Sequence, residues 1–219
     1  MLRVESLGIA FGKGRTRRQI LKSISFTAAE GSITCIMGKS GAGKTTLLDL
    51  LAMETTPDTG AICWNNASYG TLSKSQRNHF RLHDISRVFQ NYSLIESLTA
   101  AENIMLIGEL QGQRKQACKE QTESALKTLG MLDVRNSFPS QMSGGEQQRT
   151  AIARALVSQA NLVLADEPTG ALDSKMSRQV CKSLRILAER GKTVVLVTHD
   201  HDVARTSDTI LTIRDGKLS

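Results

Sequence analysis

The sequence lacks any apolar run long enough to cross a membrane. A helical span needs about 18 consecutive apolar residues, and no hydrophobic stretch of this 219-residue chain approaches that length. If the protein works at a membrane, another polypeptide must therefore supply the spans. We also find no secretory leader, internal repeat or low-complexity segment. The length suits one hydrophobic core better than two, so we expect a single domain.

Paired cysteines and aromatic residues are also scarce. Cys35, Cys63, Cys118 and Cys181 are far apart and form no C-x-x-C motif, so we expect reduced thiols in a cytosolic protein. Aromatic residues make up 4% of the chain, and aliphatic side chains must therefore fill the core. The net charge of +7 suits an anionic ligand, a nucleic acid or the inner surface of a membrane. Charge alone does not choose among them.

The chain opens with two β-prone runs, 2–11 and 20–28, which we interpret as an antiparallel pair. Between them, residues 13–18 carry four basic side chains and indicate a solvated loop. Phe11 ends the first run. Its ring would suit stacking on an adenine, and the alternative is an ordinary core position at the end of a strand.

A phosphate-loop motif follows the next β-prone run. It reads Gly38-Lys39-Ser40-Gly41-Ala42-Gly43-Lys44-Thr45 and leads into a helix-forming segment. This matches G-x-x-x-x-G-K-[ST] in the strand-loop-helix context that phosphate binding requires. The glycines let backbone N–H groups converge on an anion, and the helix N-terminus adds partial positive charge. Lys44 suits the β- and γ-phosphates, and the Thr45 hydroxyl suits Mg²⁺.

Two other interpretations compete for this loop. One is a glycine turn with an accidental lysine, although all the fixed positions of the motif are filled. The other is a dinucleotide fingerprint, which fails because its third glycine position, counted from Gly41, holds Thr46. The sequence therefore favours nucleoside triphosphate chemistry.

The middle of the chain is helical. A capping box at 99–102 opens an apolar helix through Leu110, and residues 114–129 form a second, charge-rich helix. A second capping box, Ser143 to Glu146, begins a third helix through Ser158. We therefore predict a helical segment of roughly 95–158 inserted into an otherwise alternating α/β chain.

Two carboxylates, Asp166 and Glu167, terminate the buried-type strand 161–168. Apolar neighbours cannot solvate these acids, so we expect them at the C-terminal edge of a parallel sheet, where ligands of α/β proteins bind. The strand 193–198 delivers His199 to the same edge. Asp166 suits Mg²⁺ held through water, Glu167 a water attacking the γ-phosphate, and His199 donation to that phosphate. The alternative for Glu167 is a helix cap or surface acid.

Histidines alternate with aspartates in His199-Asp200-His201-Asp202, a pattern that resembles a metal cluster. No cysteine or other histidine is near in sequence, and either aspartate suits the N-cap of a short helix, so we predict no metal there. We interpret His79 and His83 as exposed helix residues.

The turn formed by Ser143, Gly144 and Gly145 is a second helix N-terminus shaped for an anion, separate from the phosphate loop. One domain with two phosphate-facing surfaces suggests a sandwich in which the turn of one chain closes over the nucleotide of another. ATP would then hold a dimer together.

The order of these motifs resembles that of ABC transporter ATP-binding subunits over essentially the whole chain. Residues 164–173, Leu-Ala-Asp-Glu-Pro-Thr-Gly-Ala-Leu-Asp, are similar to the lipoprotein-release, macrolide-export and antimicrobial-peptide-export branch. The resemblance implies an α/β P-loop NTPase fold with a mostly parallel sheet core, an N-terminal antiparallel β subdomain and an inserted helical subdomain. It implies one nucleotide-binding domain, 1–219, with a core of roughly 1–94 and 159–219 and a helical subdomain of roughly 95–158.

The resemblance also assigns roles to residues. It implies an ATPase that binds ATP and Mg²⁺ as a head-to-tail homodimer, with Gln90 sensing the γ-phosphate and Asp173, the expected N-cap of a helix over 174–190, communicating across the dimer. The implied catalytic residues are Glu167, His199 and Lys44, and the implied magnesium ligands are Thr45, Gln90 and Asp166. The implied ATP-binding residues are Phe11, Gly38, Lys39, Ser40, Gly41, Ala42, Gly43, Lys44, Thr45, Thr46 and Gln90, with Ser143, Gly144, Gly145 and Glu146 facing the ATP of the partner chain.

The resemblance further implies a separate transmembrane permease and a position on the cytoplasmic face of the bacterial inner membrane. The cargo would be amphipathic or hydrophobic: a lipoprotein, peptide, macrolide, haem or similar toxin. We expect no nucleic-acid partner, since 114–129 is too short for the coiled coil of a chromosome ATPase and only one phosphate loop is present. A soluble ATPase acting on nucleic acid is the weaker alternative, and a cell-division type ATPase that regulates a membrane complex stays open.

Two positions depart from the family pattern. Phe11 stands where tyrosine is usual, and keeps the ring that stacks. The signature usually reads Leu-Ser-Gly-Gly-Gln, whereas here Met142 precedes it and Glu146 ends it. Glutamate preserves the capping box but places a negative charge near an incoming γ-phosphate. We therefore expect Glu146 to weaken ATP-driven dimerisation.

Overall fold

The larger sheet of the protein is six-stranded and mostly parallel, as the alternation of strands and helices predicts. The structure is a computed structural model that describes residues 1–65 and 67–218. The strand order is β10-β9-β3-β8-β7-β6, and only β10 runs antiparallel to its neighbour. The strands are β3 (Ile33–Met37), β6 (Ile85–Val88), β7 (Leu162–Asp166), β8 (Thr193–Thr198), β9 (Thr209–Arg214) and β10 (Lys217–Leu218). Every residue of β3 and β8 is buried, as expected for strands covered on both faces.

A smaller antiparallel sheet, β2-β1-β4-β5, covers one side of this core. It comprises β1 (Leu2–Phe11), β2 (Arg18–Ala28), β4 (Thr59–Trp64) and β5 (Ala67–Ser68). The predicted opening pair is confirmed. The sequence Pro57-Asp58-Thr59-Gly60 is typical of a turn, but Thr59 already pairs with Gly8 and Gly60 continues β4, so the turn is shorter than this pattern predicts. Gly60 has a φ of 85° and lies so close to β1 that a Cβ would come within 2.4 Å of the Glu5 carbonyl oxygen.

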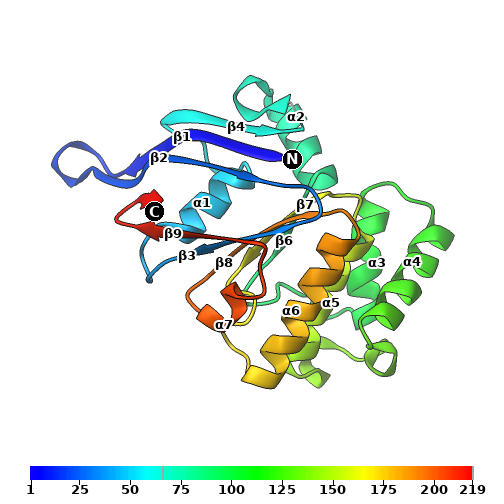
Figure 1. Cartoon of the computed structure of the whole chain (residues 1–219). Helices are drawn as coiled ribbons and strands as arrows, with labels where there is room; N and C mark the ends of the chain where they lie inside the picture. Colours follow the sequence, from blue (N-terminus) through cyan, green and yellow to red (C-terminus); the bar gives the residue numbers. More distant parts are fainter. Residues whose placement is uncertain (66, 219) are drawn as a thin grey trace.

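The helices pack in two places. They are α1 (Lys44–Leu51), α2 (Lys74–His83), α3 (Ala100–Leu110), α4 (Lys115–Thr128), α5 (Gly144–Val157), α6 (Ser174–Glu189) and α7 (His201–Ala204). Figure 1 shows α1 between the two sheets, whereas α3 to α6 lie on the opposite side of the larger sheet. Four leucines of α1 are buried in the first of these cores, together with apolar residues of both sheets. The fold therefore has two hydrophobic cores on opposite faces of one sheet.

The helix N-termini follow the sequence closely. Thr99 and Ser143 each form the predicted capping box, with Glu102 and Glu146 as partners. Asp173 caps α6 and Asp200 caps α7, also as predicted. Such caps involve residues within one turn of each other, so local sequence is enough to predict them.

Helix α5 belongs to both the helical segment and the sheet. It packs against α3 and α4, and also against α6 and β6. Ala151, Ile152 and Ala155 of α5 share a buried cluster with Cys35 and Met37 of β3. The helical segment therefore shares one core with the sheet, and its boundary at residue 158 stays a prediction. In the described part of the chain, no helix combines the length and the apolar character that crossing a bilayer requires.

Candidate nucleotide site

The phosphate-loop residues connect β3 to α1 with the strained turns that their glycines permit. Gly41 and Gly43 have φ values of 77° and 99°, in the left-handed region that favours glycine. A Cβ on Gly38 would lie 2.8 Å from the carbonyl oxygen of Ile213. Gly43 is the N-cap of α1, and no side chain caps this helix. The first-turn N–H groups are therefore suited to an anion rather than to a side-chain cap.

Lys44 lies beneath the loop, and its side chain points back toward the loop's own carbonyls. The residue is only 7% exposed. Its Nζ donates to the carbonyl oxygens of Gly38 at 2.8 Å and Lys39 at 3.3 Å. The same ammonium lies 3.3 Å from Oε1 of Glu167. The fold thus brings together two residues that are far apart in sequence.

Glu167 follows β7 in an unusual backbone conformation. The predicted strand 161–168 ends at Asp166, because Glu167 has a φ of 43° and turns out of the sheet. Few non-glycine residues adopt this region, and such strain is often found at functional sites. The side chain is 14% exposed, and its Oε2 accepts from the His199 backbone N–H and lies 3.0 Å from His199 Nδ1. The carboxylate is therefore held between Lys44 and His199.

Asp166 ends β7 beside the start of α1. Burial raises the pKa of its carboxyl group, while the nearby Arg87 guanidinium and a hydrogen bond with the Thr45 side chain oppose that rise. Gln90 lies against the turn after β7, since a Cβ on Gly170 would come within 3.0 Å of its Nε2. The sequence of residues 85–90 predicts a short strand ending on Gln90, but β6 ends at Val88, whose pairing with Ala165 is the last in the ladder. Gln90 is therefore a loop residue.

The side chains of Thr45, Asp166 and Gln90 offer a hydroxyl, a carboxylate and an amide oxygen, respectively. Mg²⁺ prefers such hard oxygen donors, and it commonly takes only one or two carboxylates together with phosphates and water. The donor set therefore fits Mg²⁺.

Among the described residues, no group of three or more His, Cys, Asp and Glu side chains is arranged to hold a metal ion. His199 instead contacts Glu167, and Asp200 caps α7.

One cavity of about 1180 Å³ joins these groups. Drug-sized ligands bind in pockets of about 300–1,000 Å³, so this space is ample for a nucleotide. Its lining includes these predicted residues: Lys39, Ser40, Gly41, Gly43, Lys44, Thr45, Thr46, Gln90, Asp166, Glu167 and His199. It also includes residues that the sequence did not indicate: Ile20, Phe89, Asn91, Tyr92 and Ala171. No motif marks the latter residues, and only the packing of β2, the loop after β6 and the turn after β7 brings them there.

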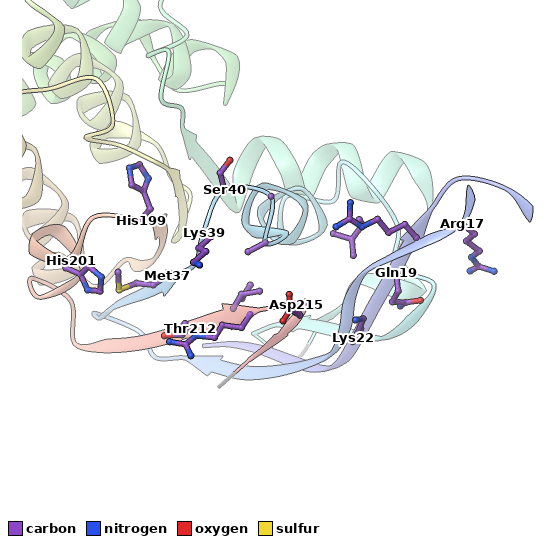
Figure 2. A pocket seen from close by; sticks show the side chains of 18 residues that line it. Arg17, Gln19, Lys22, Met37, Lys39, Ser40, His199, His201, Thr212 and Asp215 are labelled. Atoms are coloured by element: carbon purple, nitrogen blue, oxygen red, sulfur yellow. The ribbon is translucent and has the colours of Figure 1, made fainter. Parts of the chain in front are cut away.

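A second cavity, of about 1080 Å³, lies along the phosphate loop toward β9 and β10. Figure 2 shows Lys39 above the strand carrying Thr212, with His199 and His201 on one side of it, whereas Ser40 points away from that strand. Gly38 and Ala42 line this cavity rather than the first. Lys13, Arg17 and Arg18 of the basic run are exposed, as predicted, but Arg17 and Arg18 also line the cavity, so positive charge flanks the loop on this side.

Phe11 ends β1 and is 48% exposed. The alternative that it is a core residue at the end of a strand is therefore wrong. It lines neither cavity. Its ring is accessible to a planar ligand, and the stacking role stays a prediction.

The turn at the start of α5 does not line the nucleotide cavity. Glu146 accepts hydrogen bonds from the Ser143 backbone N–H and from the Ser143 hydroxyl, both at 2.8 Å, and these bonds hold the pKa of Glu146 below its usual value. A Cβ on Gly144 would lie 2.7 Å from the Tyr92 hydroxyl oxygen, and one on Gly145 would lie 3.1 Å from Met176. A side chain at either position would have to displace Tyr92 or Met176, so close packing favours both glycines independently of any ligand.

Asp173 begins α6 as a strong cap. Its Oδ1 accepts from the backbone N–H groups of Lys175 and Met176, each at 2.8 Å. We expect Asp173→Ala to lower the free energy of unfolding by about 1 kcal/mol. Urea titration measures this loss, with Glu30→Ala, an exposed turn residue, as the control. Equal stability of the two variants would contradict the capping contribution.

Comparison with known proteins agrees with this geometry. The family model described as "ABC transporter" matches residues 21–170. The chain is 37% identical over 218 residues to an uncharacterised ABC transporter ATP-binding protein, MJ1508, of Methanocaldococcus jannaschii, covering 100% of this chain and 97% of that one. It is 38% identical to the macrolide export ATP-binding/permease protein MacB of Aggregatibacter actinomycetemcomitans, covering 100% of this chain but only 34% of MacB.

A solved structure extends the likeness to three dimensions. The ATP-binding cassette MJ0796, in a dimeric post-hydrolysis state bound to ADP and Pi, superposes with a TM-score of 0.89 at 34% identity. The match covers 100% of this chain and 97% of that one. With the family model, the curated relatives and the fold in agreement, the chain belongs to the ABC transporter family and is an ATP-binding, ATP-hydrolysing cassette.

Proposed function

We propose that two copies of this chain bind two ATP molecules head to tail and that their ATPase cycle powers a separate export permease. One observation supports the proposed dimer. The Ser143–Gly145 turn is shaped for an anion, yet it lies outside the cavity that holds Lys44 and Glu167 of the same chain. A second copy would supply that turn. The dimeric state of the MJ0796 cassette with ADP and Pi supports this arrangement.

The proposed chemistry is in-line hydrolysis. The oxygen of a water molecule attacks the γ-phosphorus, its proton passes to Glu167, and the bond to the bridging oxygen breaks so that ADP leaves with the electron pair. Lys44 binds the β- and γ-phosphates, and the backbone N–H groups of the loop surround them. His199 both orients Glu167, through the 3.0 Å contact, and donates to the γ-phosphate. Phe11 stacks on the adenine.

Thr45, Asp166 and Gln90 would hold Mg²⁺, which supplies charge neutralisation at the phosphates. Lys44 also forms an ion pair with Glu167, with 3.3 Å between the ammonium and the carboxylate. ATP phosphates compete for that ammonium, so binding would free the carboxylate to accept a proton. Gln90, at the start of the loop after β6, would report the state of the site to the permease, and Asp173 would act across the dimer.

The export role rests on the branch of the family. MacB is by name a combined ATP-binding and permease protein, and this chain matches 34% of its length. We therefore propose a permease on another polypeptide, a cytoplasmic-face position at the bacterial inner membrane, and an amphipathic or hydrophobic cargo such as a lipoprotein, peptide, macrolide or haem. The second candidate is an ATPase that regulates a membrane complex, and nucleic acid is the least favoured partner.

Affinity purification of the tagged chain from detergent-solubilised cells tests this function. A multi-span partner that raises the ATPase rate supports the membrane role, and cargo movement in reconstituted vesicles separates transport from regulation. Recovery of RNA or DNA in place of a membrane protein would overturn the proposal.

We expect Glu146→Gln to strengthen ATP-driven dimerisation severalfold without changing the fold. The amide oxygen of glutamine can still accept from the Ser143 N–H, so the capping box survives while the charge facing the γ-phosphate is lost. Light scattering across an ATP titration in a Glu167→Gln background measures the dimer fraction. The matched control is Glu123→Gln, which removes an exposed carboxylate paired with Arg135. A dimer fraction that is unchanged or lower than that of the Glu167→Gln background would contradict this expectation.

A further inference from the structure

Arg87 is a nearly buried cation that no motif of the sequence indicates. It lies on β6, and its side chain is 10% exposed. Its Nη1 lies 3.0 Å from Asp49 Oδ1 and 2.7 Å from Glu54 Oε2, and its Nη2 lies 3.9 Å from Asp166 Oδ2. The guanidinium also stacks over the Phe89 ring, 4.6 Å from the centroid. Such a set of contacts requires the planar, many-donor guanidinium group.

Three of these four contacts, all except the one to Glu54, lead to a segment that carries a proposed magnesium ligand. Asp49 lies one turn after Thr45 on α1, and therefore on the same face of that helix. Asp166 is a proposed ligand itself. Phe89 lines the nucleotide cavity and directly precedes Gln90. One side chain thus touches the carriers of all three ligands, which come from separate parts of the chain.

The carboxylates around Arg87 outnumber its single positive charge, and one of them lines the nucleotide cavity. Three carboxylates surround this one guanidinium, and Asp166 is the carboxylate among them that lines the cavity. A buried cation needs such partners to offset its desolvation. Asp49 and Glu54 pair closely with Nη1, whereas Asp166 lies 3.9 Å from Nη2 and faces the cavity, so its carboxylate stays available to a divalent cation. Arg87 cannot coordinate a metal, so any effect on one must pass through its neighbours.

The geometry points to Arg87 as a positioning residue of the magnesium site, one that sets the relative placement of Thr45, Gln90 and Asp166. This inference rests on the proposed role of those residues in binding Mg²⁺ with ATP. Outer-shell partners of metal ligands typically change metal affinity by about 10- to 100-fold when they are removed. Removal of the Arg87 side chain would eliminate its contacts with Asp49, Asp166 and Phe89 together. All three ligands would therefore lose a common support.

The test separates metal binding from nucleotide binding. Binding of a fluorescent ATP analogue is measured in EDTA and in Mg²⁺, and Mn²⁺ binding to the protein with ATP is followed by electron paramagnetic resonance. For Arg87→Met we expect affinity in EDTA within about twofold of the unmodified protein, and a Mn²⁺ half-saturation raised about tenfold. Arg87→Lys, which keeps the charge but loses the planar fork, should fall between the two.

Two controls keep the outcome decisive. Arg185→Met removes an equally short ion pair, 2.9 Å from Asp208, far from the cavity lining, and should leave Mn²⁺ binding unchanged. If Arg87→Met does not fold, the same measurements are made on Arg87→Lys, which retains the buried positive charge. Unaltered Mn²⁺ half-saturation, or an equal loss of ATP affinity with and without metal, would overturn the inference. Failure of the unmodified protein to gain ATP affinity from metal would instead count against the proposed magnesium role.

Discussion

Glu167→Gln is expected to lower the steady-state turnover of ATP at least ~100-fold while ATP binding is retained. The amide is close in size to the carboxylate but cannot accept the proton of the attacking water. Lys44 and His199, which hold Glu167 at 3.3 and 3.0 Å, remain in place. Phosphate release gives the turnover, and equilibrium binding of a fluorescent ATP analogue gives the affinity.

The same variant also reports on the proposed dimer. With hydrolysis blocked, ATP should hold two 23.9 kDa chains together, and ADP should not. Glu123→Gln, an exposed glutamate on α4, serves as the matched control and should keep its turnover. Residual hydrolysis above about a tenth of the original rate would reject Glu167 as the general base, because such a base contributes more than that.

Lys44→Met is expected to weaken ATP binding at least ~100-fold, with a still larger loss in kcat/KM. Hydrogen bonds to charged groups contribute about 1.5–3 kcal/mol each, and the ammonium is placed to form two with the phosphates. Lys44 is buried, and two loop carbonyls hold its ammonium group beside the phosphate loop. Its charge is therefore already placed at the anion site. Isothermal titration measures the affinity.

Lys115→Met is the matched control, since Lys115 begins α4 and lines neither cavity beside the phosphate loop. Its ATP affinity should equal that of the unmodified chain. Circular dichroism establishes that both variants fold. An affinity of Lys44→Met within tenfold of the original would mean that the backbone N–H groups, rather than this ammonium, dominate phosphate binding.

The convergence of the site could be predicted because the ends of parallel strands meet. Lys44 after β3, Asp166 at the end of β7 and His199 after β8 all lie at the carboxyl ends of strands of one sheet, so their common edge follows from the alternating pattern. The strand limits were less accurate. Gln90 and Glu167 were expected on strands, and both lie beyond the last paired residues, where the chain turns into the cavity.

Arg87 marks the limit of sequence analysis within the site. In the sequence it is one polar residue in a short β-prone run, and nothing local indicates its partners. Its ion pair with Asp49 spans 38 positions of the chain. Tyr92 is similar, because its contact with Gly144 depends on how the loop after β6 packs against α5. Side-chain contacts between distant segments therefore escaped the prediction, although the segments themselves did not.

The sequence by itself determined the phosphate loop, the helix caps and the strand-end carboxylates. Each of these depends on residues within one turn or one loop of each other: Gly43 needs only its own freedom to adopt a positive φ, and Ser143 needs only Glu146. Tertiary structure decided which groups meet. The placement of Glu167 between Lys44 and His199, and of Arg87 among three carboxylates, depends on packing between strands and helices. Burial makes those contacts strong, and burial exists only in the folded chain.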